Sequence, residues 1–214
     1  MTQKKSTERR AQIIQGAFDA MQSQGLPTMS YDAIAESAGL TRQLVRYHFP
    51  DPEGLMLAVC NMLAELYREA MVSTAGQQTG PTRVDAFLDF YFDLLEGHTK
   101  PRDDKVYDAL LAMANSSRPI RNNLASQYKL LGQVLAQEFL VQYPKLDQRS
   151  SAELSYLFVC LMYGHWKMVA TLGFDNDHRY ITRRAMDRLI RSYVEYPGDS
   201  DAEIRAWTRD PPHG

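Results

Sequence analysis

The chain has 214 residues, of which 44% are hydrophobic and 23% charged, and its formal charge at pH 7 is −2. This hydrophobic fraction is ordinary for a water-soluble globular protein, and the length can accommodate a small N-terminal domain beside a larger helical core. The two cysteines, Cys60 and Cys160, are too few and too far apart in sequence for a disulfide framework or a metal-binding knuckle, so we expect buried thiols in a reduced intracellular compartment.

Neither a secretory signal nor a membrane span is expected. The N-terminus lacks the apolar core of a signal peptide. The apolar run from Leu157 to Tyr163 is far too short to cross a bilayer. We therefore expect a cytoplasmic protein that does not enter a membrane.

Charge is distributed unevenly along the chain. Residues 1–50 hold six Lys or Arg against four Asp or Glu, a net charge of +2. The whole chain holds 24 against 26, so the remainder holds 18 against 22, a net charge of −4. The basic side chains just before or within the first helix can lie along a phosphate backbone; alternatively they belong to a solvated N-terminal tail. These side chains are Lys4, Lys5, Arg9 and Arg10.

Residues 28–49, TMSYDAIAESAGLTRQLVRYHF, contain two short helical patterns joined by a turn of small residues. Ser30 can cap the N-terminus of a first helix that starts near Tyr31. Gly39 stands where a left-handed residue ends that helix, and Thr41 caps the next one. This spacing brings the second helix to the surface, where it can enter a DNA groove.

The two helices have an apolar and a polar face. The apolar residues form a set that we expect to point inward, and the polar or amphipathic residues of the second helix remain available outside. The inward set is Ile34, Ala35, Ala38, Leu40, Val45 and Phe49, and the outward set is Arg42, Gln43, Arg46 and Tyr47.

The segment AIAESAGLTRQLVRYHFPDPEGL, residues 33–55, resembles the DNA-binding signature of TetR-family transcriptional regulators, in which a glycine turn leads to an aromatic-His-Phe ending. The resemblance covers Thr7 to about Met56. It implies an all-α fold, with an N-terminal three-helix DNA-binding domain that contains the helix-turn-helix and a larger helical domain for ligand binding and dimerisation. It also implies repression that a small-molecule effector relieves.

Two positions depart from the family pattern. The family usually has Tyr where Arg46 stands and Lys where Pro52 stands, and both usual side chains tend to meet phosphates. Arg46 can keep a phosphate contact or reach a guanine edge, whereas Pro52 cannot replace the charge of a lysine. Pro52 instead suits the first position of a helix capped by Asp51.

The residues around the second helix are assigned to parts of a DNA duplex. We expect Arg42, Gln43 and Arg46 at base edges, because a guanidinium suits guanine and a carboxamide suits adenine. Leu44 is expected to touch a thymine methyl. The expected phosphate contacts are Ser30, Tyr31, Thr41, Tyr47 and His48, and the family resemblance supports Tyr47 and His48 most directly.

Three of these residues also have structural alternatives. Tyr47 can pack against its own domain, and Thr41 can serve only as a helix cap. His48 can lie between helices as a hydrogen-bonded histidine.

Helical spacing of apolar residues continues beyond this segment. A long connecting helix is expected from about Leu55 to near Gly76, and the face from Val84 to Leu95 predicts another helix before a break at Gly97 to Pro101. We therefore divide the chain into a helix-turn-helix DNA-binding domain (1–50), a helical effector-binding and dimerisation domain (51–196) and a C-terminal tail without an assigned role (197–214).

Two C-terminal segments are candidates for a dimer interface. Residues 154–172 are apolar on nearly all sides, and residues 179–195 have one apolar face, so both must be covered. The family resemblance points to the same two helices, packed with those of a partner as a four-helix bundle; the alternative is burial within a monomer. We favour a homodimer, since a palindromic operator presents successive major grooves about 34 to 36 Å apart to two readers.

A ligand pocket is less clearly indicated than the DNA-binding segment. Aromatic residues, methionines and a histidine of the larger domain can line an apolar cavity, with tyrosine hydroxyls and the imidazole orienting an unknown small-molecule effector. Ordinary core packing is the alternative for each. The candidates are Phe87, Phe90, Tyr91, Tyr107, Met113, Tyr128, Met162, His165 and Trp166.

The sequence lacks the common catalytic motifs. It contains no GxSxG, HExxH or GxxxxGK segment and no pair of CxxC motifs. We therefore expect a DNA-binding regulator and no enzyme, cofactor or metal. The competing interpretation is a helical small-molecule-binding protein or enzyme whose N-terminal motif has lost DNA binding.

Overall fold

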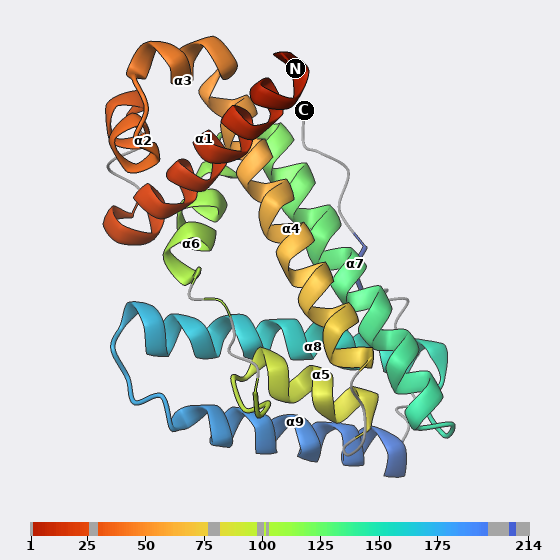
Figure 1. The fold of residues 1–214 in the computed structure, drawn as a ribbon. Coiled ribbons are helices and arrows are strands. Elements are labelled where there is room, and N and C mark those ends of the chain that lie inside the picture. The colour runs from red at the N-terminus through yellow and green to blue at the C-terminus, as the bar shows by residue number, and fades with distance from the viewer. Residues whose placement is uncertain are drawn as a thin grey trace. The chain divides into compact units, whose positions relative to one another are not determined.

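The computed structural model describes residues 2–25, 30–76, 82–97, 101, 103–196 and 206–208. Over these ranges the protein is helical and contains no strand, which confirms the predicted all-α fold (Figure 1). The helices are α1 (Thr2–Gln24), α2 (Tyr31–Ala38), α3 (Arg42–His48), α4 (Pro52–Gly76), α5 (Arg83–Tyr91), α6 (Asp104–Met113), α7 (Arg118–Gln142), α8 (Gln148–Trp166), a short π-helix (Lys167–Thr171) and α9 (His178–Glu195).

The chain divides into two compact units. Unit 1 comprises Met1–Ala70 and Arg102–Ser126, and unit 2 comprises Met71–Pro101 and Gln127–Gly214. Two of the three divisions fall inside long helices, because α4 and α7 each begin in unit 1 and end in unit 2; the third lies between α5 and α6. The expected domain boundary at residue 50 stays a prediction. No helix within the described ranges is both long and apolar enough to cross a membrane.

Unit 1 is built around one apolar core. Side chains that are almost completely buried come from six of its helices and include Ile13, Ile34, Val45, Leu55, Leu110 and Ile120. Of the residues predicted to point inward from α2 and α3, Ile34, Ala35, Val45 and Phe49 belong to this core and the half-buried Leu40 packs against it. Ala38 is also buried, but outside this cluster. The local apolar pattern was therefore a sound guide to the inner faces of α2 and α3.

Helices α1 and α2 approach each other closely at Gly16. A Cβ atom built on Gly16 would lie 2.6 Å from the Cβ of Ala38, a separation that real Cβ atoms essentially never show. Gln12 lies one turn earlier on α1 and donates from Nε2 to the carbonyl oxygen of Ala38 at 2.8 Å. Glycine at position 16 therefore allows α1 to pass directly over the end of α2.

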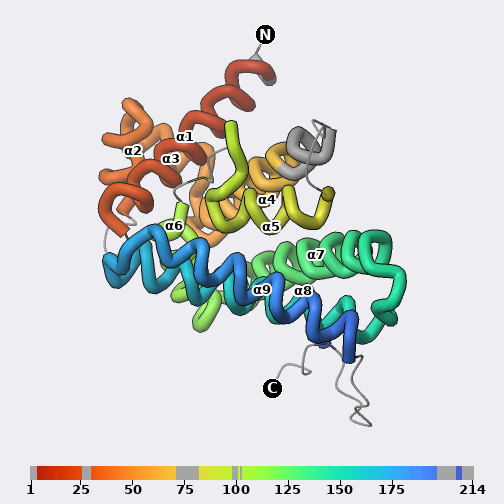
Figure 2. Tube along the Cα trace, turned by 90° about the horizontal axis from the view of Figure 1, so that it is seen from below, coloured from red at the N-terminus to blue at the C-terminus, as the bar shows by residue number. Residues whose placement is uncertain are grey.

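In unit 2, α8 and α9 lie side by side and run in opposite directions (Figures 1 and 2). The end of α5 is joined to α8 by aromatic contacts and by a hydrogen bond from Trp166 Nε1 to the carbonyl oxygen of Tyr91 at 2.9 Å. The ring of Phe158 lies 5.6 Å from Tyr91 and 5.8 Å from Phe92, both edge to face. These rings form the apolar centre of the unit.

Helix α5 ends earlier than the apolar pattern predicted. Asp93 has a φ of 57°, and the amide of Leu94 donates to the carbonyl oxygen of Asp89 at 2.7 Å. This is the closure that usually forms around a C-terminal glycine, here with an aspartate in the left-handed position. The prediction that this helix continues through Leu95 was therefore wrong, because α5 ends at Tyr91.

Arg183 of α9 ties α9 to α5 through charge. Its guanidinium donates to Asp89 Oδ1 at 2.6 Å and to Asp85 Oδ1 at 2.8 Å, and it also pairs with Asp187 one turn along α9. The Arg183 side chain is only 12% exposed. Burial lowers the pKa of Arg183, whereas the neighbouring carboxylates of Asp89 and Asp187 raise it. The net shift of the pKa is upward, so this residue stays charged.

Only Ala206–Thr208 of the predicted tail fall within the described residues; the rest of 197–214 lies outside them. Trp207 packs its indole directly against the backbone of Gly132 on α7. Its Nε1 donates to Ser155 Oγ of α8 at 2.9 Å, and its ring lies 5.3 Å from that of Tyr156. The tail, to which the sequence assigned no role, thus supplies a side chain to unit 2.

Candidate nucleic-acid interface

The predicted caps and turn between α2 and α3 are present. Ser30 accepts the amide of Ala33 at 3.1 Å, and Thr41 accepts the amide of Leu44 at 3.2 Å. Gly39 has a φ of 62° and an amide that donates to the carbonyl oxygen of Glu36. A left-handed residue at the end of α2 lets the chain turn within three residues and start α3.

Helix α3 has a buried side and an exposed side. Val45 is fully buried and Phe49, which caps the helix, is 3% exposed. The side chains of Arg42, Gln43, Arg46 and Tyr47 are exposed, and that of Leu44 is half-buried. The predicted outward set therefore shares one accessible face of a two-turn helix.

Both arginines on this face contact the first turn of α2. Arg42 Nη1 lies 3.0 Å from Asp32 Oδ2 in an exposed ion pair. The guanidinium carbon of Arg46 lies 5.8 Å from the centroid of the Tyr31 ring. A carboxylate and an aromatic face each favour a guanidinium, so α2 orients the two cationic groups of α3. Sequence reasoning missed Asp32, because its partner lies ten positions away on another helix.

Tyr47 and His48 form an edge-to-face pair with their ring centroids 5.2 Å apart. Tyr47 is 79% exposed, so it does not pack into its domain. His48 is half-buried, and its carbonyl oxygen accepts a hydrogen bond from Arg10 Nη1 at 2.7 Å. The His48 ring therefore lies at the edge of the exposed face, with its backbone tied to α1.

Tyr31 uses its hydroxyl within the unit. The hydroxyl donates to the carbonyl oxygen of Phe49 at 2.7 Å. Partial burial raises the pKa of Tyr31, with Arg46 lowering it and Asp51 raising it, and the net shift is upward. The phenol therefore keeps its proton at neutral pH and can donate this hydrogen bond.

The start of α4 has the predicted form. Pro52 is its first residue, and the Asp51 carboxylate accepts the amide of Glu53 at 3.1 Å and that of Gly54 at 3.0 Å. The side chain of Glu53 accepts the hydroxyl of Ser117 at the start of α7. The helix terminus is thus complete without the family's usual lysine.

Of the basic residues near the N-terminus, Lys4, Lys5, Arg9 and Arg10 are all exposed on α1. Arg9 Nη1 donates to Gln12 Oε1 of its own helix at 2.6 Å. Arg10 contacts the end of α3 and lies over the Phe49 ring, with its guanidinium carbon 4.1 Å from the ring centroid. The two adjacent arginines therefore differ in their contacts: Arg9 donates within α1, and Arg10 donates to the end of α3.

The predicted effector-site residues fall into two groups. Phe87, Phe90, Tyr91, Tyr128, Met162, His165 and Trp166 belong to unit 2, whereas Tyr107 and Met113 belong to unit 1. Those of unit 2 are buried except Tyr128, which is half-buried. His165 lies in the aromatic cluster, with its ring 5.9 Å from Phe92 and its Nδ1 3.3 Å from Thr182 Oγ1.

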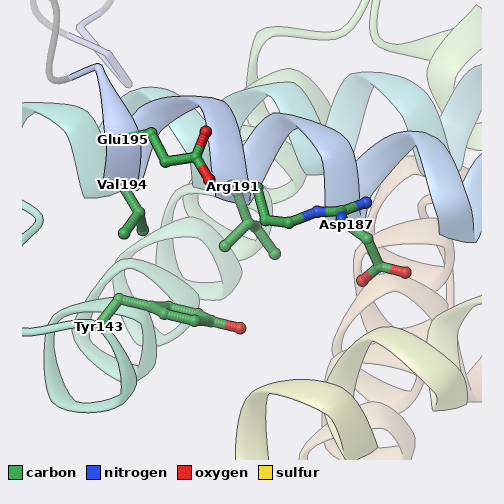
Figure 3. A pocket seen from close by; sticks show the side chains of 6 residues that line it. Tyr143, Asp187, Arg191, Val194 and Glu195 are labelled. Atoms are coloured by element: carbon green, nitrogen blue, oxygen red, sulfur yellow. The ribbon is translucent and has the colours of Figure 1, made fainter.

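A separate groove of about 390 Å³ lies in unit 2 between the end of α7 and the last turns of α9. Figure 3 shows the ring of Tyr143 facing side chains of α9 across it. Its lining residues are Tyr143, Asp187, Ile190, Arg191, Val194 and Glu195, none of which was predicted as an effector contact. Among the residues that the structure describes, no cluster of His, Cys, Asp or Glu is arranged to hold a metal ion.

The N-terminal part of the chain matches a known family. Residues 13–59 match the model of bacterial regulatory proteins of the tetR family. No curated protein matches the sequence.

Solved structures share the fold over most of the chain. A Haloarcula marismortui TetR transcription regulator is 14% identical with a TM-score of 0.72, covering 87% of this chain and 98% of its own. A Saccharomonospora viridis protein described as a transcriptional regulator, in complex with choline, is 18% identical with a TM-score of 0.71, covering 86% and 96%. The multidrug binding protein EbrR, complexed with imidazole, is 18% identical with a TM-score of 0.61, covering 85% and 94%.

The likeness to these structures establishes the helical architecture. The family-model match covers the second half of α1, α2, α3 and the start of α4, and so includes the caps, the turn and the exposed face of α3. Residues 13–59 of this chain therefore belong to the tetR family of bacterial regulatory proteins.

Proposed function

We propose that this TetR-family regulator is a homodimeric repressor that binds a palindromic operator and is released by a small-molecule effector. The observation that carries the proposal is the exposed face of α3, where Arg42, Gln43 and Arg46 lie on a helix anchored by Val45 and Phe49. A short helix with hydrogen-bonding side chains outside and an apolar anchor inside is suited to the major groove.

We assign base-edge contacts to Arg42, Gln43 and Arg46, because each good bidentate pair discriminates between bases by about 1 to 3 kcal/mol. Leu44, half-buried beside them, is assigned to a thymine methyl group. We assign Tyr47 and His48 to phosphates, together with the capping hydroxyls of Ser30 and Thr41. Each of these two hydroxyls accepts a backbone amide and so keeps its own hydrogen for donation to a phosphate oxygen.

The dimer proposal rests on the outer surface of α8 and α9. Tyr156, Cys160 and Tyr163 follow one another at helical spacing on α8, and all three are exposed. Tyr180 and Ile181 add exposed apolar surface at the start of α9. Exposed apolar side chains on two neighbouring helices favour an interaction site, and a twofold-symmetric protein suits a palindromic operator.

The effector proposal rests on the aromatic cluster of unit 2. Tyr91, His165 and Trp166 lie within it and can offer π-faces and hydrogen-bonding groups to a small molecule. Choline and imidazole are the molecules named for two structural neighbours, and aromatic faces bind organic cations. We therefore propose a small organic cation or an aromatic amine as the effector class. We further propose that the protein acts in the cytoplasm and catalyses no reaction.

The deciding experiment is selection of bound duplexes from fragmented genomic DNA, followed by fluorescence anisotropy on the enriched duplex and a scrambled one at fixed salt. We expect a clear preference for the enriched duplex, which Gln43→Ala reduces at particular bases. Sedimentation of the complex should give two chains per palindromic duplex. Equal affinity for enriched and scrambled DNA, with and without choline or imidazole, would contradict the proposal.

A further inference from the structure

The end of α3 is held by side chains from two other helices. The carbonyl oxygen of His48 accepts Arg10 Nη1 of α1 at 2.7 Å, and the next carbonyl oxygen, that of Phe49, accepts the hydroxyl of Tyr31 of α2 at 2.7 Å. Two consecutive carbonyls at one helix end are therefore bonded from two directions. The amide of Phe49 completes the last turn by donating to the carbonyl oxygen of Val45 at 2.8 Å.

Arg10 is placed by two contacts at once. Its guanidinium donates to His48 and lies over the Phe49 ring, which is itself buried in the core of unit 1. The last carbonyls of a helix have no partners within the helix and carry partial negative charge, so a guanidinium there is favourable. A planar cation that both donates and stacks fixes the helix end more tightly than a flexible ammonium can.

The length of α3 makes this anchoring consequential. The helix has only seven residues, and helices so short depend on tertiary contacts for their stability. Base recognition requires that the recognising side chains be held to within about 0.5 Å of their working positions. Movement at the end of α3 would carry Arg46 and Tyr47 with it.

We propose that Arg10 and Tyr31 are positioning residues that set the orientation of α3, and hence the discrimination between DNA sequences, rather than groups that bind phosphate. The inference deepens the proposed function, since it assumes that α3 reads DNA. It also gives Tyr31 a different role from the phosphate contact expected from the sequence, because its hydroxyl hydrogen is already donated to Phe49.

Arg10→Gln and Arg9→Gln form a matched pair for the test. Both remove one positive charge from neighbouring exposed positions of α1, but the Arg9 guanidinium donates to Gln12 of its own helix, whereas that of Arg10 donates to the end of α3. Affinity for the enriched and the scrambled duplex is measured over a range of salt concentrations. For Arg10→Gln we expect the affinity for the enriched duplex to fall by about fivefold or more, the equivalent of one lost base contact, with no change in salt dependence. Arg9→Gln should leave the preference between duplexes unchanged.

The opposite pattern would overturn the proposal. A phosphate-binding arginine contributes about 0.9 to the slope of log affinity against log salt concentration, and its loss weakens all sequences alike. If Arg10→Gln lowers that slope and weakens both duplexes equally, Arg10 is a phosphate contact. If Arg10→Lys keeps the full wild-type preference for the enriched duplex, a positive charge at position 10 is sufficient and the proposed positioning by the guanidinium is wrong.

Hydrogen exchange in the DNA-free protein tests, independently of DNA, whether Arg10 and Tyr31 anchor the end of α3. We expect Arg10→Gln and Tyr31→Phe to speed amide exchange in residues 45–49, and Arg9→Gln to leave it unchanged. Tyr31→Phe removes one hydroxyl and retains the ring beside Arg46, so it keeps the test possible should Arg10→Gln fail to fold. If amide exchange is unchanged in Tyr31→Phe, the proposed anchoring of the α3 end is wrong, even where the wild-type protein binds DNA. If the wild-type protein shows no sequence preference, only the proposed function is overturned.

Discussion

Gly16 of α1 and Ala38 of α2 lie so close together that no side chain fits between the two helices at this point. We therefore expect Gly16→Ala to destabilise unit 1 by roughly 1 to 3 kcal/mol, because the added methyl group must push α1 away from α2. The free energy of unfolding, measured by urea denaturation, checks this. Gly54→Ala is the control, since a Cβ there meets only Asp51 Oδ2 at 3.5 Å, an ordinary contact. Equal effects of the two substitutions would show that the crossing tolerates a side chain.

Asp32→Asn tests whether α2 orients Arg42, which we assign to a base edge. Loss of the carboxylate frees Arg42 from its ion pair and removes a negative charge close to the DNA backbone. We expect discrimination at one base pair to fall by about 1 kcal/mol or more, while affinity for scrambled DNA rises. Stability should change little, because exposed ion pairs contribute about 0 to 1 kcal/mol. Anisotropy on a set of single-base operator variants measures the discrimination.

Glu36→Gln is the matched control for that experiment. Glu36 is an exposed acid on the same helix, so its substitution removes the same charge. We expect it to raise the affinity for scrambled DNA without loss of discrimination. Identical behaviour of the two variants would mean that Asp32 acts through its charge alone and does not hold Arg42 in place.

The two cysteines should differ in reactivity toward a thiol reagent at pH 8. Burial raises the pKa of Cys60 to about 11, and the side chain is fully covered, so it should react only on unfolding. Cys160 is exposed on the outer face of α8 and should react readily in dilute protein. If α8 forms the dimer interface, the rate at which Cys160 is modified should fall as the protein concentration rises. A rate independent of concentration, in protein shown to be dimeric by sedimentation, would place the interface elsewhere.

Asp147, the N-cap of α8, should make stability depend on pH in the acid range. Its carboxylate accepts the amide of Ser150 at 2.6 Å, and hydrogen bonding from Ser150 lowers its pKa below the usual 3.8. A lowered folded-state pKa gives stabilisation that is present above the unfolded value and is lost as the pH falls through the folded value. We expect Asp147→Asn to unfold at a lower urea concentration than wild type at pH 7. That difference should begin to shrink as the pH falls below about 3.8 and should vanish only below the lower folded-state pKa, so an unchanged difference between pH 7 and pH 3 would exclude this origin.

The local features of the DNA-binding segment could be predicted because each depends on residues close in sequence. Ser30 and Thr41 cap their helices, Gly39 adopts the left-handed conformation, and Asp51 caps a helix that begins at Pro52. Capping and turn geometry depend on backbone conformation over a few residues, so the amino-acid types alone indicate them.

Features that depend on contacts between distant residues could not be predicted in this way. The pairing of Arg42 with Asp32 and of Arg10 with the end of α3 requires the relative placement of three helices. The expectation that both thiols are buried was correct for Cys60 and wrong for Cys160. An apolar run does not reveal which of its faces stays uncovered, because that depends on which neighbouring helices pack against it. The assignments of individual residues to base edges, phosphates and effector stay predictions.

The position of Trp207 has a practical consequence for work with this protein. Protein that ends before residue 206 would leave bare the strip of α7 backbone at Gly132 and deprive the Ser155 hydroxyl of its indole donor. Affinity tags and fluorescent fusions are therefore better placed at the N-terminus for studies of unit 2 and at the C-terminus, beyond an intact Trp207, for studies of DNA binding. Shortened versions made for crystallisation should be checked for solubility first, since the ring of Tyr156 would lose the aromatic neighbour that now lies beside it.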